Sequence, residues 1–198
     1  MRIKSLFLII ILSFSTSFAD NKQNDKASLF IENFTHQIFD IMTNENSSHA
    51  EIIAALSYEI KQNIDLGYIC NFVIGRKWKT ANPEFKKKFY ELYEKYLISL
   101  YAPQFKGYGG ETYKIIKTEE IRENRFSSQI VFISKDKTQI NLNVYFIRND
   151  KNEFKIVDVT GEGISIIASQ REEFNSVISM YGLDYFLESF QEKIQMTN

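Results

Sequence analysis

Residues 155–165 read KIVDVTGEGIS, and the hydrophobic periodicity of the chain changes within this stretch. Up to Val159 the β-branched residues are typical of a half-buried strand. Gly161 and Gly163 then provide two positions at which the backbone turns easily. After the turn, apolar residues recur at helical spacing, at Ile164, Ile167, Phe174, Val177, Ile178 and Tyr181. The stretch therefore predicts the last strand of a sheet, followed by a helix that folds back over the apolar face of that sheet.

The composition is that of one globular domain. The chain has 198 residues, of which 44% are hydrophobic and 25% are charged. Without an N-terminal leader, residues 20–198 match the usual size of a single domain with one core. Aromatic residues reach 15%, whereas Gly (8) and Pro (2) are scarce, and this favours long regular elements lined by large side chains. The formal net charge of −1 gives no strong attraction to nucleic acid.

The first 19 residues have the pattern of a cleaved secretory signal peptide. Arg2 and Lys4 precede an uninterrupted apolar run over residues 6–12, and residues 17–19 place small side chains at the minus-three and minus-one positions of a cut before Asp20. The apolar run is too short for a membrane span, which needs about 20 residues. Because Cys70 is the only cysteine, the exported domain has no internal disulfide, and we expect its thiol to be buried. The predicted location is the periplasm of a double-membraned bacterium, with the mature protein in solution.

The first half of the mature chain is predicted to be helical. Residues 21–26 are polar and should be frayed, and helices should cover residues 27–42, 49–61 and 66–74. Asn82 and Pro83 form a strong start signal for a long helix, since asparagine caps a helix and proline suits its first turn. The apolar stripe of that helix comprises Phe85, Phe89, Leu92, Tyr93, Tyr96, Leu97, Leu100 and Tyr101.

The second half is predicted to be strand-rich. Four strands are expected over residues 111–118, 125–134, 139–148 and 153–159, and short polar turns make consecutive strands antiparallel neighbours. The helix after the glycine turn should stop at Tyr181-Gly182 and be followed by a last amphipathic segment over residues 183–193. The fold class is therefore α+β, with helices packed on a four-stranded antiparallel sheet.

A search for catalytic groups finds few candidates. His36 and His49 have no second ligand at a metal-binding spacing, and the common hydrolase, nucleotide and dinucleotide motifs are absent from the sequence. Asp158 is the candidate general base of one alternative function, a small isomerase- or dehydratase-like enzyme with a cone-shaped cavity. Strand alternation instead puts Asp158 on the face opposite Val157 and Val159, where it would face solvent or tie down the glycine turn. A pure interaction module with a closed core is a further alternative.

Two separated motifs carry a resemblance to a known family. Residues 73–84 read VIGRKWKTANPE, and residues 157–165 read VDVTGEGIS. Together with the apolar helix that follows the first motif, they resemble the MlaC/toluene-tolerance family of periplasmic phospholipid-binding proteins. The resemblance extends from about Ser28 to Lys193. Gly161 departs from the pattern, because similar proteins more often have a β-branched or larger apolar residue there.

The resemblance implies a carrier of phospholipid. In such proteins helices pack on a highly twisted four-stranded antiparallel sheet that opens into an apolar slot for acyl chains. They move phospholipid between an outer-membrane lipoprotein/porin complex and an inner-membrane ABC transporter whose periplasmic face is a ring of lipid-binding domains, and so maintain outer-membrane lipid asymmetry. The resemblance implies no catalytic residue, no metal and no organic cofactor, with phospholipid as the cargo.

Periodicity and the resemblance together predict the residues of the slot. The headgroup should remain in solvent at the mouth, with weak selectivity among headgroups and with Arg76, Lys77 or Lys79 near the phosphate. The predicted lining residues are Val73, Tyr101, Tyr113, Ile115, Ile130, Phe132, Leu142, Val144, Phe146, Val157, Val159, Ile164, Ile167 and Phe174.

Overall fold

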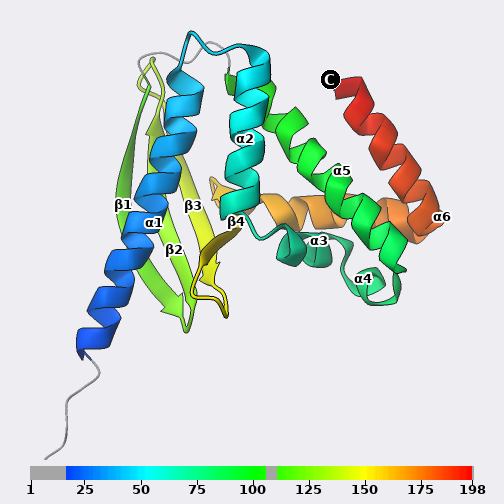
Figure 1. The fold of residues 1–198 in the computed structure, drawn as a ribbon, viewed down its shortest axis with the longest axis horizontal. Helices are drawn as coiled ribbons and strands as arrows, with labels where there is room; N and C mark the ends of the chain where they lie inside the picture. Colours follow the sequence, from blue (N-terminus) through cyan, green and yellow to red (C-terminus); the bar gives the residue numbers. More distant parts are fainter. Residues whose placement is uncertain (1–16, 106–110, 198) are drawn as a thin grey trace, which may run out of the picture.

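The computed structural model describes residues 17–105 and 111–197, which form helices and one antiparallel sheet (Figure 1). The helices are α1 (Ser17–Thr43), α2 (His49–Asn63), α3 (Leu66–Ile74), α4 (Arg76–Thr80), α5 (Pro83–Tyr101), a short 3-10 helix (Ala102–Phe105) and α6 (Ile166–Thr197). The strands are β1 (Thr112–Arg122), β2 (Arg125–Ile133), β3 (Gln139–Arg148), β4 (Phe154–Gly161) and β5 (Ile164–Ser165), in the spatial order β1-β2-β3-β4-β5. The predicted α+β class is confirmed.

The helix starts follow the capping residues in the sequence. The Ser48 hydroxyl accepts a hydrogen bond from the backbone N–H of Glu51, whose carboxylate accepts one from the backbone N–H of Ser48. The Asn82 side chain accepts a hydrogen bond from the Phe85 N–H at 2.7 Å, and Pro83 occupies the first turn of α5. Both satisfy backbone donors that a helix N-terminus leaves open. The two predicted starts are therefore confirmed.

The first helix is longer than the sequence pattern predicted. It runs from Ser17 to Thr43, so residues 21–26 are helical rather than frayed. The polarity of these residues predicts fraying, but no glycine or proline interrupts this part of the chain, and polar residues are compatible with a helix. Most of the predicted signal peptide, residues 1–16, lies outside the described residues.

The glycine turn forms a hairpin and adds a fifth strand to the four that were predicted. Glu162 (φ 48°) and Gly163 (φ 82°) occupy the two central positions of a two-residue turn between β4 and β5. Two positive φ values in a row match the turn that best fits the twist of antiparallel strands, and glycine adopts such a φ without strain. Ile164 consequently lies in β5, and α6 begins only at Ile166.

A β-bulge in β4 breaks the alternation that the sequence analysis assumed. Tyr145 of β3 pairs with Asp158, whereas the next residue, Phe146, pairs with Ile156. Val157 is therefore the extra residue of the bulge, and strict alternation of faces cannot be continued through it.

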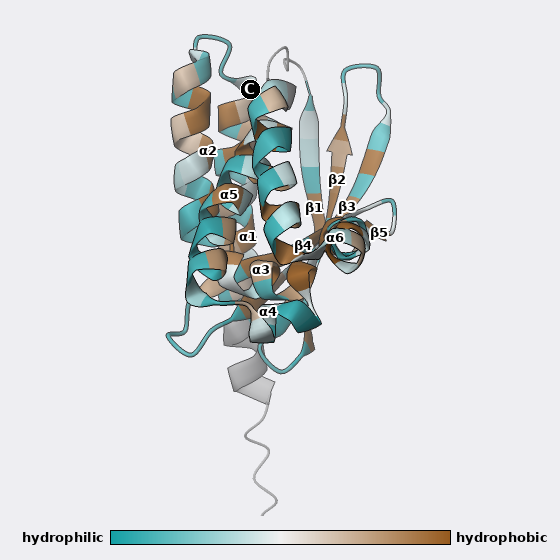
Figure 2. Ribbon diagram, turned by 90° about the vertical axis from the view of Figure 1, so that its right-hand side faces the viewer, coloured by the Kyte–Doolittle hydropathy of each residue, from teal (hydrophilic) through white to brown (hydrophobic). Residues whose placement is uncertain are grey.

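A small apolar cluster joins Ile52 and Leu56 of α2 to Ala102, and two larger clusters hold the molecule together. One lies between α1 and the sheet and includes Ile31, Phe126 and Phe146. The other joins α3, α5 and both halves of α6 around Phe89, which has no exposed surface. In Figure 2 the hydrophobic segments lie mainly where the helices meet one another and the sheet. Cys70 is buried in the helical cluster, and burial raises the pKa of its thiol to about 12, so the thiol is unreactive as well as unpaired.

The predicted helix stop at Gly182 is confirmed as a break within α6. Gly182 has φ 87° and ψ 175°, a combination that is nearly restricted to glycine, and the chain changes direction there before the second half of α6 packs on α5 (Figure 1).

We expect Gly182→Ala to lower the free energy of unfolding by about 1–3 kcal/mol through backbone strain. A Cβ at this position meets no atom within 4 Å, so steric clash adds nothing to the expected effect. Urea unfolding measures the change. The matched control is Gly67→Ala in α3, where a Cβ meets only an Asp65 oxygen at 3.5 Å, and where we expect no loss or a gain of about 0.4–1 kcal/mol. Equal effects of the two substitutions would contradict the assignment of strain to Gly182.

Candidate functional site

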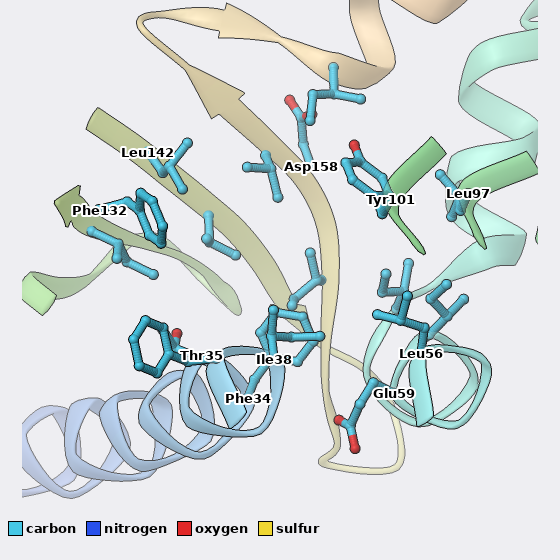
Figure 3. Close-up of a pocket in the computed structure, with 18 of the residues that line it drawn as sticks. Phe34, Thr35, Ile38, Leu56, Glu59, Leu97, Tyr101, Phe132, Leu142 and Asp158 are labelled. Atoms are coloured by element: carbon cyan, nitrogen blue, oxygen red, sulfur yellow. The ribbon is translucent and has the colours of Figure 1, made fainter. Parts of the chain in front are cut away.

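A cavity of about 440 Å³ lies between the sheet and the helices α1, α2 and α5, with the start of α6 at one side (Figure 3). Most of its wall is hydrocarbon from aliphatic and aromatic side chains. Its volume is roughly three times the ~150 Å³ of an apolar cavity that holds benzene. The cavity is therefore large enough for a flexible hydrocarbon chain, and its wall suits such a guest.

The cavity is closed at one end and open at the other. At the end formed by α2, α3 and the middle of α5, lining residues such as Leu56, Ile60 and Leu97 are buried. Toward the β2–β3 turn and the C-terminal end of α5 the lining residues are partly exposed, and Ile140 reaches 40% exposure. An elongated guest would therefore have its apolar end near Leu56 and its other end near Ile140.

More than half of the predicted slot residues border the cavity. The structure places on its wall Tyr101, Tyr113, Ile130, Phe132, Leu142, Val144, Val159 and Ile167. These residues come from four strands and two helices that are distant in the sequence.

The other six predicted residues lie elsewhere. Val73 and Phe174 belong to the helical cluster around Phe89, where neighbouring side chains fill the space completely. Phe146 is buried in the cluster between α1 and the sheet, and Ile115 packs against that cluster. The last two of the six residues do not line the cavity because of the local path of the backbone. Val157 is the extra residue of the bulge, and Ile164, on the short strand β5, is 68% exposed.

The sequence analysis missed the contribution of α1 and α2 to the wall. Phe34, Ile38 and Met42 line the cavity from α1, and Leu56 and Ile60 line it from α2. The helical spacing of the α1 residues was recognised, but an apolar stripe does not distinguish a helix that fills a core from one that borders a cavity. The position of α1 and α2 between the sheet and α5 shows that their apolar residues border a cavity.

The three predicted headgroup contacts lie away from the cavity. Arg76, Lys77 and Lys79 are exposed on α4, which forms because Gly75 ends α3 and the chain starts a new helical turn. Figure 1 shows α4 at the opposite end of the helical layer from the β2–β3 turn. Among the described residues that line the cavity, none comes from α4. The position of Arg76, Lys77 and Lys79 therefore gives no support to the predicted contact of these residues with the phosphate.

Asp158 borders the cavity, contrary to the prediction that it faces away, at the edge where β4 meets the start of α6. Its carboxylate accepts hydrogen bonds from the Ser165 hydroxyl at 2.7 Å and from the Ile167 N–H at 3.3 Å. Asp158 thus ties the end of β4 to the start of α6, as the other part of that prediction stated. A carboxylate held in this way has a structural role at the turn.

Glu59 is the second carboxyl group on the wall, and it lies at the closed end. Only 5% of the residue is exposed, and its Oε2 accepts a hydrogen bond from Asn63 Nδ2 at 2.7 Å. Burial raises the pKa of Glu59, while the hydrogen bond from Asn63 acts in the opposite direction. The protonated form is therefore favoured more in the folded protein than in the unfolded chain.

The raised pKa of Glu59 predicts a pH-dependent cost to stability. An unfolded glutamate titrates near pH 4.3, roughly, so the cost is absent well below that pH and grows as the pH rises through the folded pKa. We expect Glu59→Gln to be more stable than the natural protein at pH 7.5 and to lose this advantage at pH 3.5. Urea unfolding at both pH values measures the difference. Glu91→Gln, at an exposed site on α5, is the control, and a pH-independent effect of Glu59→Gln would contradict the prediction.

Two broader features of the described residues bear on the kind of site. Within residues 17–105 and 111–197, no group of three or more His, Cys, Asp and Glu side chains is placed to hold a metal ion. In the same part of the chain, none of the helices has both the length and the hydrophobicity needed to cross a membrane.

Comparison with known proteins agrees with this geometry. The family described as MlaC protein matches residues 32–192. The intermembrane phospholipid transport system binding protein MlaC of Haemophilus influenzae is 22% identical over 132 residues, which cover 65% of this chain and 62% of that protein. A phospholipid-binding protein from Ralstonia solanacearum, solved in complex with a phospholipid, has a TM-score of 0.76 at 14% identity and covers 86% of this chain and 98% of its own. At that identity the structural match shows a shared fold.

The fold is that of a protein with an apolar cavity between an antiparallel sheet and a layer of helices. Because the family match covers most of the sequence, the chain belongs to the MlaC family.

Proposed function

We propose that this protein is a periplasmic carrier that binds phospholipid by its acyl chains and moves it through water between membrane complexes. The observation that carries the proposal is the open cavity of about 440 Å³ with an almost entirely apolar wall. Membership of the MlaC family supports it, as does the fold shared with a protein solved in complex with a phospholipid.

The physical need for such a carrier follows from the cost of exposing hydrocarbon to water. Two acyl chains hold on the order of 30 methylenes, and at about 0.8 kcal/mol each their transfer into water costs more than about 20 kcal/mol. A cavity lined by Ile, Leu, Val and Phe replaces one apolar environment with another. Transfer between a membrane complex and the carrier can then be nearly neutral, whereas release into water is slow.

The proposed partners follow the family. The outer-membrane partner would be a lipoprotein/porin complex, and the inner-membrane partner an ABC transporter with a ring of lipid-binding domains. The proposed role is the maintenance of outer-membrane lipid asymmetry. The cavity itself holds no energy source, so a net direction of transport has to come from these partners.

The enzyme alternative has one observation in its favour, since Asp158 borders the cavity. It requires Asp158 to act as a general base, but the two oxygens of that carboxylate accept hydrogen bonds from the Ser165 hydroxyl of β5 and the Ile167 N–H of α6, and the family match favours the carrier.

Uptake of lipid from vesicles tests the proposal. Purified protein is stripped of lipid, incubated with vesicles of mixed phosphatidylethanolamine and phosphatidylglycerol, separated from them, and extracted for mass spectrometry. We expect phospholipid in the protein fraction, with a headgroup ratio close to that of the vesicles. Absence of phospholipid would refute the proposed function, and a single headgroup class would refute the predicted weak selectivity.

A further inference from the structure

Most polar atoms on the cavity wall already have partners within the protein. The Tyr93 hydroxyl donates a hydrogen bond to Gln170 Oε1, and the Glu59 carboxyl accepts one from Asn63. The Asp158 carboxylate is occupied by the Ser165 hydroxyl and the Ile167 N–H. These groups therefore have little capacity to hold a ligand.

Tyr101 differs from them. Its ring lines the cavity, and its hydroxyl makes no hydrogen bond to any of the described residues. The Thr35 hydroxyl on α1 also lacks a partner among these residues, but surrounding atoms enclose it completely, so a ligand cannot reach it. The Tyr101 hydroxyl is not enclosed in this way. It is thus a hydrogen-bonding group that a guest in the cavity can contact.

The third tyrosine on the wall, Tyr113, has a different environment. Burial raises the pKa of Tyr113, and Asp40 and Glu32 raise it further. Its ring packs edge-on against Phe39 of α1, with the ring centroids 5.0 Å apart. Tyr113 therefore belongs to the wall, and the matched control is Tyr58 of α2, which is 61% exposed and does not line the cavity.

Tyr101 lies at the level where the polar part of an amphiphile must be. It is the last residue of α5 and is partly exposed, whereas Leu97, one turn earlier, is buried. Figure 3 shows Tyr101 beside Asp158 on one side of the cavity, with Leu56 and Glu59 at a different level. Acyl chains that extend toward Leu56 would leave their ester groups near the Tyr101 hydroxyl.

The chemistry of this hydroxyl specifies its partner. Burial raises the pKa of Tyr101, and the neighbouring Tyr96 and Asp158 raise it further, so the group stays protonated and acts as a donor. A ligand acceptor at this hydroxyl would add a neutral hydrogen bond, which is worth about 0.5–1.5 kcal/mol. The glycerol region of a phospholipid offers ester carbonyl oxygens, which accept hydrogen bonds and do not donate them.

We propose that Tyr101 is a specificity-determining contact, whose hydroxyl donates a hydrogen bond to an ester carbonyl oxygen of the bound lipid. The proposal rests on the proposed function and goes further, because it assigns the depth of the cargo and a preference for ester-linked over ether-linked lipids. Headgroup chemistry does not enter it, since the contact lies below the headgroup.

The test combines one substitution in the protein with one in the lipid. Tyr101→Phe keeps the ring and removes the donor, and a diether phospholipid keeps the headgroup and chain length but lacks the carbonyls. Competitive uptake from vesicles that contain equal amounts of diester and diether lipid gives the ratio of the two affinities. We expect the natural protein to favour the diester by about threefold to tenfold, the range of one neutral hydrogen bond, and Tyr101→Phe to show no preference.

The controls separate this contact from packing. Tyr58→Phe, at an exposed site on α2 outside the cavity, should keep the diester preference, and thermal unfolding should show that Tyr101→Phe remains folded. Equal preference in the natural protein and Tyr101→Phe would overturn the proposal, as would loss of the preference in Thr35→Val instead. If the natural protein takes up neither lipid, the proposed function fails; if it takes up both equally, only the role of Tyr101 fails.

Discussion

Val144→Trp should reduce the phospholipid that the protein takes up from vesicles by about tenfold or more, while the protein remains folded. Val144 lies in β3 on the cavity wall with only 5% of its surface exposed. The larger side chain of a tryptophan at this position would extend into the cavity. It would therefore occupy volume that the acyl chains would otherwise fill. Displacing even two methylenes from apolar contact costs about 1.6 kcal/mol, which is more than a factor of ten in affinity.

The matched control for Val144→Trp is the same substitution at Val131 of β2. Val131 pairs with Lys114 and Asn141, and residues that pair directly point to the same face of a sheet. Because both partners are exposed, Val131 faces away from the cavity, and its replacement should leave lipid uptake unchanged. Quantification of extracted lipid, with thermal unfolding to verify the fold, decides the result. Undiminished lipid in folded Val144→Trp would show that the cargo does not occupy this cavity.

Phe89→Ala should destabilise the protein by about 3–5 kcal/mol, the largest loss of stability that we expect from a single substitution here. Phe89 is fully buried at the centre of the helical cluster. Its ring centroid lies within 6.3 Å of the rings of Trp78, Phe85, Tyr93, Phe174, Phe186 and Phe190. Removal of the ring leaves a void among rigid aromatic neighbours that cannot collapse into it. Since domains are stable by only about 5–15 kcal/mol, a large part of the folding free energy would be lost.

Urea unfolding with linear extrapolation measures the effect of Phe89→Ala. Tyr90→Ala changes the next residue of α5, which is 41% exposed, and it should cost far less. A loss below about 1 kcal/mol for Phe89→Ala would mean that the cluster rearranges to fill the void, contrary to its close packing.

Local patterns in the sequence predicted most of the fold. The capping residues Ser48 and Asn82 satisfy helix N-termini through side chains a few positions away, so their effect is visible in a short window. The strands were predictable for the same reason, because each pairs with its neighbour in the chain through a short turn. The fifth strand was missed, since the two residues of β5 are too few to show a period.

The candidate site was harder to predict because a cavity is a property of several elements together. Val144 and Phe146 are two positions apart in β3 and point to the same face, yet Val144 lines the cavity and Phe146 is packed under α1. Only the path of α1 across the sheet distinguishes them. The bulge at Val157 could not be predicted either, since no feature of the sequence over residues 155–159 indicates which residue is the extra one.

The order of strands in the sheet has a consequence for folding kinetics. Because the strand order β1-β2-β3-β4-β5 follows the sequence, each hairpin can form through contacts that are close along the chain. The helical cluster instead needs distant partners, such as Asn175, which donates a hydrogen bond to the Val73 carbonyl 102 positions earlier. We therefore expect the meander to be structured early and the docking of α6 to limit the overall rate. During that interval the apolar surfaces of α3 and α5 that α6 covers are exposed to solvent, and the nascent protein is most prone to aggregate.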